Sequence, residues 1–371
     1  MLDVTWHQVF AWRLKRQSLV PRTSDSVAEI VRRCAGIQAQ VHSAAVLAVA
    51  QRRRSPKPGE VDRALWEDRS IVKTWAMRGT LHLVSADELA TVVGVMRTLN
   101  PWSRPSWVKY FGITAAEVEK VRDTIGDVLE GRVLTRDELG AEVADRVRSR
   151  HVRELLRSGW GMLLKPAAYA GLLIQGPPKG ARVTYTAPRT WLGSWSDPDA
   201  IEAGAALVRS YLHAHGPARM SDVSAWWARQ SPGKVKPWFD ALRERGELVE
   251  VDVEGRRSWL LASDLDALRH QKSTAEVRLL PSFDQYVIAA ARDIESLVPA
   301  ARRKDVFRTA GWISPTIVRG GAVIGTWSAS DGVIDLRAWT RTTESSDDEV
   351  SRVARLSSRV GDGVVEDEAE A

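Results

Sequence analysis

The sequence predicts an α+β protein in which a segment of three helices followed by a β-hairpin occurs three times, ahead of a β-rich C-terminal segment. Two observations support this prediction. In three stretches of the chain, apolar residues recur at helical spacing and then alternate at strand spacing. After about residue 273, the chain changes to short strands and turns.

The third of these stretches shows the pattern most clearly. Residues 198–215 have the apolar spacing of a helix, Ser221 is the expected N-cap of a short second helix, and a third helix stops at Gly246. Two alternating strands then flank Glu254 and Gly255, which is typical of a β-hairpin. Three helices followed by a hairpin form a winged-helix unit, a helix-turn-helix with an added β wing.

The second stretch, about residues 114–187, has two sequence signatures of helix starts. Thr114 with Glu117, and Thr135 with Glu138, have the spacing of capping boxes. A third helix is expected at about 150–165. Two strands around the Pro-Pro-Lys-Gly tip at 177–180 complete the unit.

The first stretch is more elaborate than the other two. A helix is expected at about 5–17, and Ser26 and Glu29 have the spacing of a capping box that begins the next one. The remaining expected elements of this stretch are helices at 42–53 and 59–68, two strands around Arg78 and Gly79, and a helix that starts at Ser85–Glu88. In the C-terminal segment, Ser346 is expected to cap the last helix of the chain.

These patterns divide the chain into four expected segments. Residues 1–112, 113–196 and 197–272 are predicted to be winged-helix units, and residues 273–371 to be a mixed β-rich unit that packs back on the first. We expect the tandem units to form a C-shaped clamp around a DNA duplex, and the protein to be a monomer, because no coiled coil or dimerisation segment is visible.

The charge of the chain is compatible with nucleic-acid binding. The net charge is +6, and 42 of the 53 basic residues are Arg, which makes bidentate contacts with phosphate and guanine. GC-rich coding would also enrich Arg, so charge alone does not decide the matter. No stretch approaches the roughly 18 apolar residues of a membrane span, and the N-terminal segment does not read as a signal peptide. We therefore expect a cytoplasmic, nucleoid-associated protein.

Several kinds of chemistry have no support in the sequence. There is no phosphate-binding Gly-Xaa4-Gly-Lys-Ser/Thr loop, no dinucleotide-binding glycine fingerprint and no Gly-Xaa-Ser-Xaa-Gly elbow. The single Cys34 leaves too few thiolates for a zinc site, and the histidines show no paired metal spacing. His213 and His215, two residues apart in a helix, are expected on the surface. The sequence thus predicts no metal and no cofactor.

Gln38 and Gln40 are the most suggestive polar pair. They flank Ala39 between two predicted helices, and in extended backbone such side chains point the same way, so that two amides would face one target. An amide is not a general base at neutral pH, but it can hold a water by donating and accepting at once. Glutamines near a helix end are more often solvated or capping groups, so the pair alone leaves both interpretations open.

Four motifs resemble those of a known enzyme family. In order along the chain they are Gln38–Gln40, Arg78–Val84, Leu280–Val287 and Val306–Ile313. Together they resemble the AlkZ-like winged-helix DNA glycosylases, a family that includes the azinomycin-resistance glycosylases. The resemblance extends over essentially the whole chain.

The resemblance implies a function and a catalytic pair. It implies a monofunctional, metal-independent DNA N-glycosylase that acts on double-stranded DNA, removes N7-alkylated purines and unhooks azinomycin-type interstrand crosslinks in self-resistance or DNA repair. The family's Gln-apolar-Gln pair corresponds to Gln38 and Gln40. A related branch carries Gln-Xaa-Asp there, and the Gln form kept by this chain is typical of the crosslink-resistance branch.

Further residues have both a functional and a structural interpretation. Asp284 would supply a carboxylate near the sugar cation, although a Phe-Asp-Xaa-Tyr turn more often caps locally, and His82 would contact DNA or lesion, although a strand histidine is more often structural. The expected DNA contacts, each of which could equally be a solvated or helix-ending charge, are Arg78, Lys179, Arg182, Arg52 and Arg53.

The alternative function is a non-catalytic transcriptional regulator made of several winged-helix units. Regulators usually carry one such unit with a dimerisation or ligand-binding domain. Three different units in one chain therefore favour an enzyme that surrounds a duplex.

Overall fold

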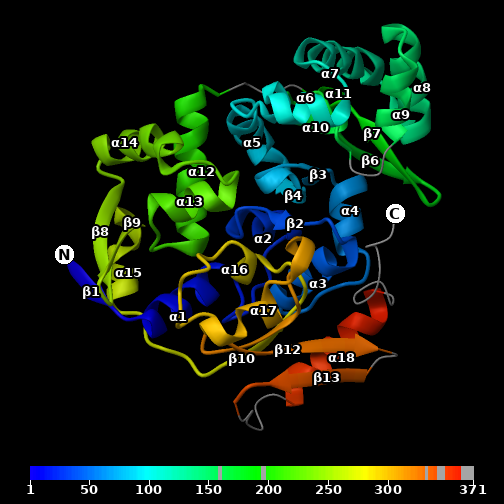
Figure 1. The fold of residues 1–371 in the computed structure, drawn as a ribbon. Coiled ribbons are helices and arrows are strands. Elements are labelled where there is room, and N and C mark those ends of the chain that lie inside the picture. The colour runs from blue at the N-terminus through cyan, green and yellow to red at the C-terminus, as the bar shows by residue number, and fades with distance from the viewer. Residues whose placement is uncertain (158–160, 194–197, 331–332, 341–346, 361–371) are drawn as a thin grey trace. The chain divides into compact units, whose positions relative to one another are not determined.

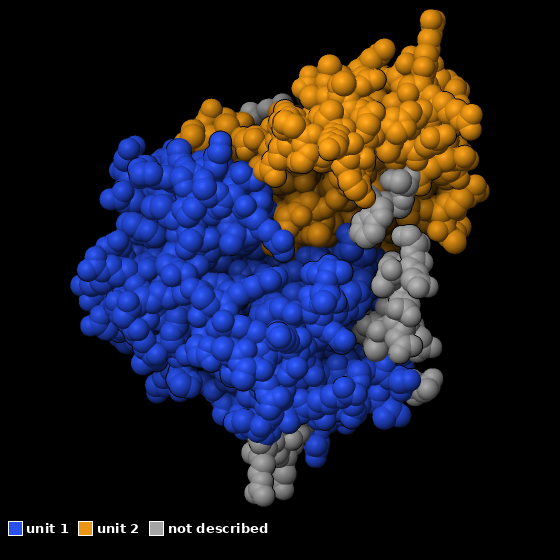
Figure 2. All heavy atoms as spheres, viewed as in Figure 1, with its two compact units in different colours: residues 1–61, 208–370 blue, residues 62–207, 371 orange. Residues whose placement is uncertain are grey.

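The computed structural model describes residues 1–157, 161–193, 198–330, 333–340 and 347–360 (Figure 1). The chain forms two compact units, coloured separately in Figure 2: unit 1 comprises residues 1–61 and 208–370, and unit 2 comprises residues 62–207. Helices and strands occur in both units, so the predicted mixed α+β class is confirmed. The finer division into four segments stays a prediction.

The N-terminal part of unit 1 contains three helices that bury apolar side chains. Its first elements are β1 (Leu2–Val4), α1 (Trp6–Arg16), α2 (Val27–Arg33), β2 (Ile37–Gln38) and α3 (His42–Arg52). Thr5 caps α1, because its hydroxyl accepts from the Gln8 amide at 3.3 Å while the Gln8 side chain accepts from the Thr5 amide at 3.0 Å. The helix expected at 5–17 is thereby confirmed.

The third repeat has the expected helices and hairpin. Its elements are α12 (Ala200–His215), which runs from unit 2 into unit 1, then α13 (Met220–Trp227), α14 (Lys236–Glu244), β8 (Leu248–Val253), β9 (Arg256–Leu261) and α15 (Leu265–Arg269). Strands β8 and β9 pair antiparallel, and β1 adds a parallel third strand that the sequence did not predict.

Two expectations for this repeat were wrong. Helix α13 starts at Met220 and not after Ser221, because the Arg219 amide donates to the Asp222 carboxylate at 2.8 Å and caps the helix there. His215 is 1% exposed and not on the surface, with its Nδ1 3.2 Å from the amide nitrogen of Gln17.

The C-terminal part of unit 1 is an antiparallel sheet with short helices around it. The strands are β10 (Val277–Leu280), β11 (Thr316–Arg319), β12 (Ala322–Ser330) and β13 (Val333–Ala338), and the helices are α16 (Gln285–Ile288), α17 (Arg303–Val306) and α18 (Asp347–Val360). Leu47 and Ala50 of α3 share a core with this sheet and with Val353 of α18, so the C-terminal segment packs back on the first helices as expected (Figure 1). Ser346 lies outside the described residues.

Unit 2 carries two hairpins among short helices. Its elements are α4 (Glu60–Trp66), whose first two residues belong to unit 1, β3 (Ile71–Trp75), β4 (Leu81–Ser85), α5 (Leu89–Met96), α6 (Pro105–Phe111), α7 (Ala115–Leu129), β5 (Val133–Thr135), α8 (Arg136–Val147), α9 (Arg150–Arg157), α10 (Leu164–Tyr169), β6 (Ile174–Lys179), β7 (Arg182–Thr186) and α11 (Pro188–Leu192).

Most of the local predictions for unit 2 are confirmed. Both capping boxes, at Thr114 and Thr135, are present, and the β3–β4 and β6–β7 hairpins pair antiparallel. The three-residue strand β5 joins β7 and was not predicted. Within the described part of the chain, no helix has both the length and the apolar character of a membrane span.

Candidate active site and DNA-contact residues

A tight turn leads the chain from α2 into the segment that carries the glutamine pair. Ala35 (φ 55°) and Gly36 (φ 89°) both adopt left-handed backbone after the end of α2. Their amides donate back to carbonyl oxygens in the last turns of that helix, at 2.9 and 3.0 Å. The turn therefore ends α2 sharply and sends the chain into the extended pair Ile37–Gln38.

Gln38 and Gln40 differ in exposure. Gln38 is 5% exposed and the intervening Ala39 is fully buried, whereas Gln40 is exposed just before α3 begins at His42. The expected pair thus consists of one enclosed carboxamide and one that reaches the surface of unit 1.

The structure corrects the interpretation of Arg52. Its guanidinium is fully buried at the end of α3 and binds the Asp284 carboxylate through two contacts of 2.7 and 2.8 Å, as well as the side-chain oxygen of Gln17 at 3.2 Å. Burial acts to lower the pKa of Arg52, but attraction to the Asp284 carboxylate, together with the interaction with Cys34, holds that pKa above its usual range. A guanidinium that is fully buried and paired with a carboxylate does not reach a DNA phosphate, so the expected contact was wrong.

Asp284 has a structural role that accounts for both of its carboxylate oxygens. One oxygen accepts from the Tyr286 amide at 2.9 Å and caps α16, and both bind Arg52. The side chain is 1% exposed. This is the local capping role, and the carboxylate does not lie open to a substrate.

Cys34 is fully buried and lies close to the Arg52 guanidinium. It is the residue at which α2 ends, two positions before Gly36. Burial raises the pKa of its thiol to about 11, although the nearby Arg52 guanidinium acts in the opposite direction. A neutral buried thiol is a packing group and not a nucleophile.

Arg53 is also held inside unit 1. Its guanidinium donates to the backbone oxygen of Ser24 at 2.9 Å and to that of Asp25, and lies 3.4 Å from the Glu60 carboxylate. Its side chain is 16% exposed. The contacts of Arg53 in this structure are internal, and its expected contact with DNA stays a prediction.

His82 and Arg78 form a pair on the β3–β4 hairpin of unit 2. His82 is fully buried, its Nδ1 donates to the Thr80 carbonyl at 3.0 Å, and its Nε2 lies 3.5 Å from a nitrogen of Arg78. Burial, together with the Arg78 charge, lowers the pKa of His82 to about 3. His82 is therefore a neutral acceptor that orients Arg78, which adopts left-handed backbone (φ 58°) at the hairpin bend.

Lys179 and Arg182 lie at the tip of the β6–β7 hairpin, where both are exposed. The Lys179 ammonium donates to the Val133 carbonyl at 3.1 Å and lies 3.4 Å from the Glu138 carboxylate.

Two observations complete the description of the site residues. Among the described residues, no three His, Cys, Asp or Glu side chains gather as metal ligands would. Sequence reasoning also missed three cations that line a pocket of unit 1, Arg292, Arg303 and Lys304. The basic run at 302–304 is the signal in the sequence that points to them.

Comparison with known proteins assigns the class of enzyme. Residues 31–360 match the family model described as DNA glycosylase AlkZ-like. The chain therefore belongs to the AlkZ-like family of DNA glycosylases, enzymes that hydrolyse N-glycosyl bonds.

The similarity extends to individual relatives over almost the full length. The chain is 38% identical to the interstrand DNA cross-link repair glycosylase of Streptomyces sahachiroi, covering 96% of this chain and 97% of that protein. It also superimposes on the structure of the Streptomyces sahachiroi DNA glycosylase AlkZ with a TM-score of 0.90 and 37% identity, covering 96% of this chain and 98% of the other.

Proposed function

We propose that this protein excises N7-alkylated purines from duplex DNA and unhooks azinomycin-type interstrand crosslinks, as a monofunctional, metal-independent glycosylase. The observation that carries this proposal is the similarity to a cross-link repair glycosylase over 96% of the chain. The protein would act as a monomer on the DNA of the nucleoid, in DNA repair or self-resistance.

Hydrolysis of the N-glycosidic bond of an N7-alkylated purine needs little general acid or general base catalysis. Alkylation at N7 makes the purine cationic, so the bond between the base and C1′ breaks with its electron pair moving onto the base and neutralising that charge. The sugar becomes an oxocarbenium ion in the transition state. A water oxygen then bonds to C1′ and its proton is lost to solvent. The protein has chiefly to place that water and stabilise charge.

We assign the placing of the water to Gln38 and Gln40. A neutral carboxamide donates and accepts at once, and it does not trap the cationic lesion in an ion pair. Gln38 is enclosed and Gln40 is exposed, so the two carboxamides would hold the water where the buried segment meets the surface of unit 1. The Ala35–Gly36 turn, together with the buried Arg52–Asp284 pair, would hold this segment in place.

We further propose that the three helix-and-hairpin segments are winged-helix units that surround the duplex as a clamp. Arg78, Lys179 and Arg182, on two of the hairpins, would contact phosphate. His82 would support Arg78 from within the hairpin, and Asp284 would support the glutamine segment through Arg52. A bulky crosslink would be attacked without full extrusion of the base, unlike small lesions that are usually flipped.

The test uses purified full-length protein and two duplexes of one sequence, one undamaged and one containing N7-methylguanine or an azinomycin-type crosslink. We expect heat- or alkali-labile abasic sites only in the damaged duplex, with chelator present. If the damaged duplex stays intact while a particular undamaged sequence is bound tightly, the protein is a regulator and the proposal is wrong.

A further inference from the structure

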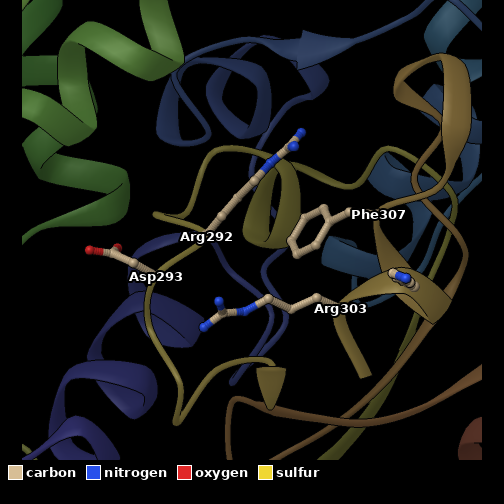
Figure 3. Close-up of a pocket in the computed structure, with 5 residues that line it drawn as sticks. Arg292, Asp293, Arg303 and Phe307 are labelled. Atoms are coloured by element: carbon tan, nitrogen blue, oxygen red, sulfur yellow. The ribbon is translucent and has the colours of Figure 1, made fainter. Parts of the chain in front are cut away.

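Unit 1 has an open pocket of about 350 Å³ beside the segment that links α16 to α17. It is lined by Arg292, Asp293, Arg303, Lys304 and Phe307 (Figure 3). Three of these five side chains are cations and one is an aromatic ring. Such a lining is suited to an anion that carries an apolar part.

The acidic member of the lining does not neutralise the pocket. The Asp293 carboxylate already binds Arg219 at 2.7 Å and Arg256 at 3.0 Å. Figure 3 shows the Asp293 carboxylate pointing away from Phe307. The Asp293 carboxylate is therefore paired with two arginines that do not line the pocket.

The three cations are only partly compensated. Arg303 lies 3.0 Å from the exposed Glu295 carboxylate, yet its buried Nε has no hydrogen-bond partner. Arg292 lies over the Phe307 ring at 4.8 Å, and burial, with the like charge of Arg229, lowers its pKa. Like charges gathered in this way repel one another, and a bound anion would relieve that repulsion.

We infer that this pocket binds a backbone phosphate of the DNA duplex, a contact that anchors the substrate away from the glutamine pair. The inference rests on the proposed function. Arginine guanidinium groups bind phosphate oxygens bidentately, and lysine binds them as a point charge. The Phe307 ring offers an apolar surface for the adjoining deoxyribose. A backbone contact of this kind positions the duplex without reading its sequence.

The experiment compares wild-type protein with the double variant Arg292→Gln/Lys304→Gln, both of whose side chains are exposed in the structure. Affinity for undamaged duplex is measured over a series of salt concentrations. We expect about tenfold weaker binding at low salt. The slope of log K against log salt should become shallower by about one for each phosphate that the variant no longer binds. An unchanged thermal midpoint would show that the fold is intact.

The matched control is Arg269→Gln/Lys272→Gln, which removes the same charge from two other exposed residues of unit 1. It should leave the slope nearly unchanged. The inference is wrong if the control loses as much affinity as the pocket variant. It is also wrong if the pocket variant keeps the wild-type slope, or binds DNA normally but loses affinity for inorganic phosphate, which would make this a free-phosphate site. Failure of wild-type protein to excise any lesion would instead overturn the proposed function.

Discussion

The Arg52 guanidinium and the Asp284 carboxylate form a two-point ion pair at 2.7 and 2.8 Å, and neither side chain reaches solvent. The pair joins the end of α3, the helix that follows Gln40, to the cap of α16. The family resemblance alone would place Asp284 near the substrate. In the structure, the partner of Asp284 is instead a buried residue of the protein, Arg52. Any effect of Asp284 on the proposed catalytic segment would therefore pass through Arg52.

Removing the charge of one partner of this ion pair should lower the free energy of unfolding more than removing both charges. Arg52→Met leaves the buried carboxylate uncompensated and is expected to lower the free energy of unfolding by about 3–5 kcal/mol. The double variant Arg52→Met/Asp284→Asn, which keeps a capping side chain, should recover much of that loss. Urea unfolding measures both. Equal instability of the single and double variants would show that the charge of Asp284 is not the cause.

The glutamine pair should matter for excision far more than for binding. Gln38→Ala/Gln40→Ala is expected to slow single-turnover excision by about 100-fold or more, because the water is no longer positioned. Affinity for undamaged duplex should stay nearly unchanged. Gln271→Ala is the control, a half-buried glutamine elsewhere in unit 1. If affinity and excision fell in parallel, the pair would be a DNA contact and not a catalytic group.

The tip of the β6–β7 hairpin should contribute to the salt dependence of binding. Lys179→Gln/Arg182→Gln is expected to make the slope of log K against log salt shallower by about two, one for each phosphate contact. The control is Lys109→Gln/Lys120→Gln, which removes the same charge from exposed positions of the same unit. This control should leave the slope unchanged. The same slope in both double variants would assign the effect to net charge.

Local patterns predicted the hairpins and capped helices because their determinants lie close together in the sequence. The capping box of Thr114 with Glu117 is an example. The strand β1 was missed because three residues carry too short a pattern, and its partner β8 is about 250 residues away. Arg52 was misinterpreted for a related reason. A basic residue at a helix end is usually solvated, and only the fold brings Asp284, 232 residues away, into contact with it.

His82 should make acid pH destabilising. Its pKa in the folded protein, about 3, lies below the ordinary value of 6.5, so the unfolded chain takes up a proton that the folded protein refuses. The contribution of His82 to the free energy of unfolding is fully present above pH 6.5 and is lost as the pH falls toward 3. About 2 kcal/mol should disappear between pH 8 and pH 5. Unfolding of wild type and His82→Asn at both pH values measures this, and an equal loss in the two proteins would contradict it.

The turn between β11 and β12 should tolerate no side chain at Gly321. A Cβ there would overlap that of Phe10 in α1 and lie 2.6 Å from the Tyr286 hydroxyl, which donates to the Gly321 carbonyl at 2.8 Å. Gly255 has similar backbone, φ +85° against +91°, but nothing within 4 Å of such a Cβ. Gly255→Ala should therefore cost only the backbone strain, about 1–2 kcal/mol. Gly321→Ala should cost about 2 kcal/mol more, because the packing must also shift. Matching urea midpoints for the two variants would show that the turn can move away from α1.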